Sequence, residues 1–66
     1  MKVFVNGKER TFDEGMTLSK MISALNLNVM GMIIERNLEV VSKSEYDKMV
    51  LKNGDKVELI RLVGGG

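Results

Sequence analysis

The chain has 66 residues, of which 44% are hydrophobic and 29% charged, and its formal net charge is +1. This length allows one domain at most, and so short a chain buries only about 60% of the surface that it exposes when unfolded. The sequence contains neither Cys nor His, which excludes a disulfide framework and removes thiolate and imidazole metal ligands. We therefore expect a soluble domain that is held together by apolar packing and backbone hydrogen bonds, without a metal.

The distribution of apolar and charged residues disfavours two classes of partner. The longest purely apolar runs, such as residues 32–34, are three residues long, whereas a membrane-spanning helix needs about 20. Ten basic residues are interleaved with nine acidic ones, and only three residues are aromatic, so neither a basic stripe nor a base-stacking platform is predicted. The start of the chain reaches Asn6-Gly7 too early for a signal peptide. We expect a cytoplasmic protein that binds no nucleic acid and no membrane.

The first twelve residues predict a β-hairpin. Residues 2–6 alternate with period two and contain β-branched side chains, which is typical of a strand. Asn6-Gly7 suits a two-residue type I′ turn, because both central positions of that turn need positive φ. Residues 8–12 then return as a second strand, and Phe12 is its expected inward anchor.

A helix is predicted over residues 17–26. Thr17 is a good N-cap, because its hydroxyl can accept a hydrogen bond from a free backbone N–H of the first turn. Met16 and Met21 occupy the N′ and N4 positions of a hydrophobic staple. One apolar stripe follows the i, i+3, i+4, i+7 spacing of a helix and consists of Leu18, Met21, Ile22 and Leu25.

The second half of the chain predicts three more strands, over residues 32–36, 39–41 and 56–63. A polar segment with one helical turn follows the second of these strands, and Asn53-Gly54-Asp55 is a turn signal before the last one. Met32, Val50 and Leu51 are expected to pack into the core.

The resulting element order is β-β-α-β-β-β, which predicts an α+β fold. The first and last strands can lie side by side in parallel, and the helix then covers one face of a single mixed sheet. This is the β-grasp, or ubiquitin-like, architecture. We expect a β-grasp domain over residues 1–63 and a flexible glycine tail over residues 64–66.

The tail is the chemically unusual feature of the sequence. Gly64, Gly65 and Gly66 have no side chains and the greatest backbone freedom of any residue type, so we expect them to project beyond the last strand. Such a segment can thread through a narrow channel into the active site of another protein, and its carboxylate is sterically open. A frayed end without function is the alternative interpretation.

A larger set of motifs resembles the sulfur carrier of bacterial thiamine thiazole biosynthesis, the ThiS family. The resemblance covers essentially the whole chain. Each motif is weak by itself, but their order is specific; they are residues 5–8 (Val-Asn-Gly-Lys), 34–37 (Ile-Glu-Arg-Asn), 44–46 (Ser-Glu-Tyr), 51–58 (Leu-Lys-Asn-Gly-Asp-Lys-Val-Glu) and 63–66 (Val-Gly-Gly-Gly).

The resemblance implies a mechanism and a set of partners. An E1-like adenylating enzyme of the ThiF type would use ATP to activate the Gly66 carboxylate, and a sulfur donor protein would then supply the sulfur of a C-terminal thiocarboxylate. Thiazole synthase of the ThiG type would consume that sulfur. The chain itself is expected to be no enzyme and to bind no cofactor, because it lacks a phosphate-binding loop and has no His or Cys for acid–base or nucleophilic work.

Strand alternation also predicts an apolar partner surface. If Val3 and Val57 face the helix, the opposite face of the sheet receives Phe4, Ile60 and Leu62. We expect these three residues to form one patch near the tail and, together with Val63 at its base, to bind a partner. The alternative interpretation is that these are scattered exposed apolar residues, which are normal on a protein surface.

Three other functions remain open from the sequence. The small subunit of molybdopterin synthase shares the β-grasp fold, the Gly-Gly end and the thiocarboxylate. A plain β-grasp interaction module would have no acyl chemistry. A conjugating modifier of the ubiquitin type would form isopeptide-linked adducts.

Overall fold

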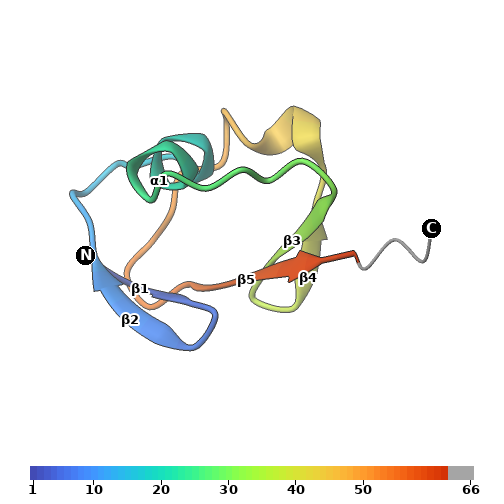
Figure 1. The fold of residues 1–66 in the computed structure, drawn as a ribbon. Coiled ribbons are helices and arrows are strands. Elements are labelled where there is room, and N and C mark those ends of the chain that lie inside the picture. The colour runs from blue at the N-terminus through green and yellow to red at the C-terminus, as the bar shows by residue number, and fades with distance from the viewer. Residues whose placement is uncertain (63–66) are drawn as a thin grey trace.

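Five strands form one mixed sheet in the computed structural model, which describes residues 1–62. The strands are β1 (Lys2–Val5), β2 (Lys8–Thr11), β3 (Met32–Arg36), β4 (Glu39–Val41) and β5 (Lys56–Arg61). Their order across the sheet is β2-β1-β5-β3-β4; β1 and β5 are parallel, and the other neighbours are antiparallel. The predicted parallel pairing of the first and last strands is confirmed, and β5 lies at the centre (Figure 1).

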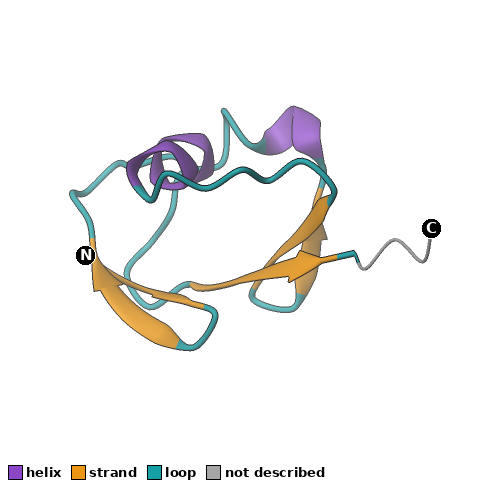
Figure 2. Ribbon diagram, viewed as in Figure 1, coloured by secondary structure: helices purple, strands orange, loops and turns teal. Residues whose placement is uncertain are grey.

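The two helical segments lie on the same side of this sheet (Figure 2). They are α1 (Leu18–Ala24) and the short 3-10 helix η1 (Lys43–Glu45). Within residues 1–62, no helix covers the other side. We call the two sides the helix-covered face and the open face. The predicted α+β architecture, with one main helix on one face of a mixed sheet, is confirmed.

Helix α1 begins as predicted but ends earlier than the predicted residue 26. The backbone N–H of Lys20 donates to Thr17 Oγ1 over 3.2 Å, which confirms Thr17 as the N-cap. Leu25 caps the C-terminal end, and Asn26 follows with φ +58°. A residue in this left-handed conformation ends a helix, and Asn tolerates it better than most other residues.

The core lies between α1 and the helix-covered face of the sheet. Its buried apolar residues are Val3, Val5, Leu18, Met21, Ile22, Ile34, Val41, Leu51 and Val57. Phe12 packs against this cluster as predicted. The predicted burial of Met32 and Val50 is wrong: Met32 is half-buried outside the cluster, opposite exposed Arg61, and Val50 is 48% exposed.

Both two-residue hairpin turns use left-handed backbone conformations. Asn6 and Gly7 have φ of +50° and +81°, in agreement with the type I′ turn predicted between β1 and β2. Between β3 and β4 the same role falls to Asn37 and Leu38, with φ of +52° and +71°. Positive φ is unfavourable for a bulky side chain, and Leu38 is 88% exposed, so burial in this chain does not compensate for its strain.

Candidate functional site

The end of β5 determines where the glycine tail begins. The strand ends at Arg61 instead of the predicted residue 63. Leu62, the last described residue, still donates its backbone N–H to the carbonyl oxygen of Gly31 over 3.2 Å. The last described residue is thereby held beside the segment that leads into β3. The predicted site residues Val63, Gly64, Gly65 and Gly66 lie outside the described residues.

Two asparagine side chains hold β5 in place. Asn6 Oδ1 accepts the backbone N–H of Leu59 over 2.7 Å, and Asn37 Oδ1 accepts that of Lys56 over 2.9 Å. Each asparagine therefore has two roles, because it also adopts the left-handed conformation of its own hairpin turn. The two bonds tie the start and the middle of β5 to the turns on either side of it, so the strand leads into the tail from a fixed position.

Asp55 anchors the turn that precedes β5. Its side chain is buried, and its carboxylate accepts hydrogen bonds from the backbone N–H of Lys52 over 2.8 Å and from Asn37 Nδ2 over 3.1 Å. The guanidinium of Arg36 lies 3.7 Å from the same carboxylate. A buried carboxylate is tolerated when it is paired and hydrogen-bonded in this way. Asp55 thus has a structural role, and its carboxylate is occupied by partners within the chain.

Alternation along β1 and β5 places the predicted apolar residues on the open face. Val3, Val5 and Val57 are buried on the helix-covered face, so Phe4 and Ile60 point to the opposite side, and the same alternation continues to Leu62. Ile60 is 42% exposed and Leu62 is 55% exposed, whereas Phe4 is half-buried. Whether these residues bind a partner stays a prediction.

The strand register separates Phe4 from Ile60 and Leu62. It also places two further apolar residues, Ile33 and Val40, on the same face near Ile60. Phe4 lies beside Lys56, four residues and therefore about 13 Å along β5 from Ile60, so it does not form one patch with Ile60 as expected. Ile60 lies opposite Ile33 of β3. Val40 is exposed on β4 and shares the open face with Ile33, because Val41 pairs with buried Ile34 on the other face.

We define the open-face patch as Ile33, Val40, Ile60 and Leu62. Glu35 and Glu58 border it on the open face, because Glu35 pairs with Val40 on one side and with Glu58 on the other. An exposed apolar centre with a polar rim is the usual composition of a protein–protein interface. The patch lies at the end of the sheet where β5 leads into residues 63–66.

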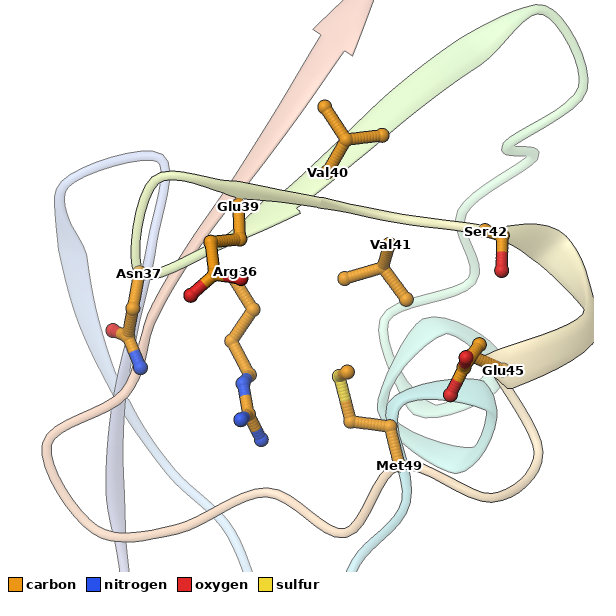
Figure 3. A pocket seen from close by; sticks show the side chains of 8 residues that line it. All are labelled: Arg36, Asn37, Glu39, Val40, Val41, Ser42, Glu45 and Met49. Carbon is orange, nitrogen blue, oxygen red and sulfur yellow. The ribbon is translucent and has the colours of Figure 1, made fainter.

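A pocket of about 320 Å³ lies under the β3–β4 hairpin. Figure 3 shows the side chains of Arg36, Val41 and Met49 on one side of the hairpin and that of Val40 on the other. Arg36 is paired with Asp55, and the other polar side chains of the lining are those of Asn37, Glu39, Ser42 and Glu45.

Among residues 1–62, no three Asp or Glu side chains group as metal ligands. No helix in the same part of the chain is long and apolar enough to cross a membrane.

Comparison with known proteins identifies the family. The model of the ThiS family matches residues 3–66. The chain belongs to the ThiS family. It is 33% identical over 64 residues to the sulfur carrier protein ThiS of Bacillus subtilis, and the match covers 94% of this chain and 96% of the relative. The crystal structure of a thiamine biosynthesis protein (ThiS) from Geobacter metallireducens superposes with a TM-score of 0.88 at 35% identity over the whole of both chains. The predicted family and β-grasp fold are confirmed.

Longer proteins contain a region that is similar to this chain. The thiazole synthases of Paramagnetospirillum magneticum and Magnetococcus marinus match over all 66 residues, at 39% and 33% identity. This ThiS-family chain spans about a fifth of the length of each, since the match covers 20% of either protein.

Proposed function

We propose that the protein is a sulfur carrier of thiamine biosynthesis and that its cargo is bound at the carboxylate of Gly66. One observation carries the proposal: the family match extends from residue 3 through residue 66 and therefore includes the glycine tail. The relative in Bacillus subtilis, which is named a sulfur carrier, has nearly the same length as the matched region. The defined position of β5 and the chemistry of a glycine tail are consistent with this role.

The chemistry requires activation, because a carboxylate is a poor acyl donor. An adenylating enzyme would join the Gly66 carboxylate to AMP with release of pyrophosphate from ATP. The outer sulfur of a persulfide on a donor protein would then attack the carbonyl carbon and release AMP, which gives an acyl disulfide. A thiol would next cleave the S–S bond, which leaves the thiocarboxylate on Gly66 and a new disulfide between that thiol and the donor sulfur. The carrier has no phosphate-binding loop, no His and no Cys, so we assign ATP binding and catalysis to the E1-like partner and propose that the carrier is not an enzyme.

Thiazole synthase is the proposed recipient of the sulfur. Two proteins with that name contain a region similar to the whole of this chain within one longer polypeptide. Presence in one polypeptide gives two domains a high effective concentration relative to each other. This supports a functional protein–protein contact between carrier and synthase. The names of these relatives favour the thiamine pathway over the molybdopterin alternative.

The open-face patch is the proposed docking surface for the activating enzyme. Ile33, Val40, Ile60 and Leu62 would enter the apolar centre of the contact, with Val63 beside the tail, and Phe4 would make a separate contact further along the sheet. Docking at this end of the sheet leaves only residues 63–66 to reach the active site, a span of up to about 14 Å when the chain is extended.

Deletion of Gly66 tests the proposal. The carrier, ATP and the cognate activating enzyme are incubated, and adenylation is followed by pyrophosphate exchange. Deletion leaves Gly65 with a free carboxylate, but that carboxylate ends about 3.3–3.6 Å short of the original position. A misplacement of about 1 Å can already reduce a rate by roughly 100-fold, so we expect exchange to be lost. Exchange at the rate of the unmodified protein would contradict the assignment of Gly66.

A further inference from the structure

A second pocket, of about 310 Å³, lies on the helix-covered face between the β1–β2 hairpin and the segment that leaves α1. Its apolar floor includes Leu25, Leu27 and Leu59, which are half-buried and pack against the core. Lys8 and Arg10 line it from β2. We call this pocket the basic groove. It opens on the opposite side of the sheet from the open-face patch.

The register of the hairpin brings the two cations to the groove. Lys8 pairs with Val5 and Arg10 with Val3, and both valines face the core, so both cationic side chains lie on the helix-covered face. Glu9 lies between them in sequence and therefore points to the open face, where it pairs with Lys2. Neither Lys8 nor Arg10 forms an ion pair within residues 1–62.

The floor of the groove is fixed by backbone hydrogen bonds. The left-handed turn at Asn26 leads Leu27 back toward the helix, where its N–H donates to the carbonyl oxygen of Ile22 over 3.2 Å. The N–H of Leu59 is bound by Asn6 Oδ1. The groove therefore exists before any ligand binds, which reduces the ordering cost of binding.

We propose that the basic groove is a docking site for a segment of a partner protein that presents an aliphatic side chain flanked by carboxylates. The apolar floor accepts the aliphatic group, and the two cations on β2 supply the complementary charge. They are two residues apart on one strand, about 7 Å, which matches carboxylates on either side of a single inserted residue. β2 is also an edge strand, so its outer backbone groups can pair with an extended segment. This surface involves neither the tail nor its chemistry and goes beyond the proposed sulfur transfer.

A peptide titration of the full-length protein tests this inference without any activating enzyme or sulfur source. The probe is a blocked pentapeptide of alternating glutamate and leucine, and the control peptide carries lysine in place of glutamate. Amide chemical shifts of the isotope-labelled carrier are followed by NMR. We expect saturable changes at Leu27, Leu59 and β2 with the acidic peptide only, and weaker binding as the salt concentration rises.

Charge reversal supplies the matched variants. The double variant Lys8→Glu with Arg10→Glu should bind the acidic peptide at least about tenfold more weakly. The double variant Lys43→Glu with Lys48→Glu makes the same change in net charge at exposed positions away from the groove and should bind like the unmodified protein. Unchanged spectra overturn the inference, as does an equal loss in both variants. Tighter saturable binding of a thymidine oligonucleotide at the same residues also overturns it, because the ligand would then be a nucleic acid.

Discussion

Substitution of Ile60 distinguishes a docking role of the open face from a purely structural one. Full burial of an Ile side chain is worth about 1.5–3 kcal/mol. Because 42% of Ile60 is exposed, docking has about 0.6–1.3 kcal/mol still to gain on the same scale, so Ile60→Ala should weaken binding of the activating enzyme about 3- to 9-fold. In Ile60→Asp an unpaired polar group in the contact adds about 1–3 kcal/mol, and the expected loss rises to roughly 15- to 1,000-fold.

The same substitution should change folding less than binding. Within the chain, Ile60 loses mainly its cross-strand pair with Ile33, and such pairs contribute about 0.2–1 kcal/mol. The buried 58% of Ile60 is worth about 0.9–1.7 kcal/mol on the burial scale used above, so the free energy of unfolding from urea titrations should fall by about 1–2 kcal/mol, while calorimetry with the activating enzyme reports the loss of affinity.

Val50→Asp is the matched control. Val50 is 48% exposed and forms an isolated bridge with Thr17 beside α1, away from the open face. The Val50→Asp variant should lose about as much stability as Ile60→Asp does, but it should bind the activating enzyme normally. The reasoning is refuted if Ile60→Asp binds normally, if it unfolds the protein, or if Val50→Asp weakens binding equally.

Three further substitutions test how the fold is held together, each by urea unfolding. Ile22→Ala should destabilise by about 2–5 kcal/mol, because Ile22 is a buried core residue; a loss below 1 kcal/mol would contradict that placement. Leu38→Gly should stabilise by about 1 kcal/mol by removing a left-handed leucine, whereas Val40→Gly in the same hairpin should not stabilise. Asp55→Ala should cost about 2–4 kcal/mol because it leaves two donors without their acceptor, and exposed Asp47→Ala, its control, should change little.

Local sequence signals predicted most of the elements. The Asn6-Gly7 turn and the Thr17 cap both depend on neighbours within a few residues, and both were predicted correctly. The burial of Met32 and Val50 was not predicted correctly, because it depends on long-range placement: Met32 pairs with Arg61 of β5, and Val50 lies outside the sheet in an isolated bridge with Thr17. Local sequence patterns therefore predicted the type of each element more reliably than they predicted how deeply a residue is buried.

The candidate surfaces needed the strand register, which the sequence does not reveal. Alternation correctly placed Ile60 on the open face, but its pairing with Ile33 depends on how β3 and β5 align. The bond from Leu59 to Asn6 joins residues 53 positions apart. The basic groove likewise combines Lys8 and Arg10 with leucines from distant segments. No local pattern signals such combinations.

The mass of the loaded protein tests the central claim most directly. The carrier is incubated with ATP, the cognate activating enzyme and a sulfur source, and its intact mass is compared with that of a sample without ATP. We expect a gain equal to the exchange of one oxygen for one sulfur, and fragmentation should locate that gain at Gly66. An unchanged mass with an active cognate enzyme, or sulfur located anywhere other than residue 66, would contradict the account.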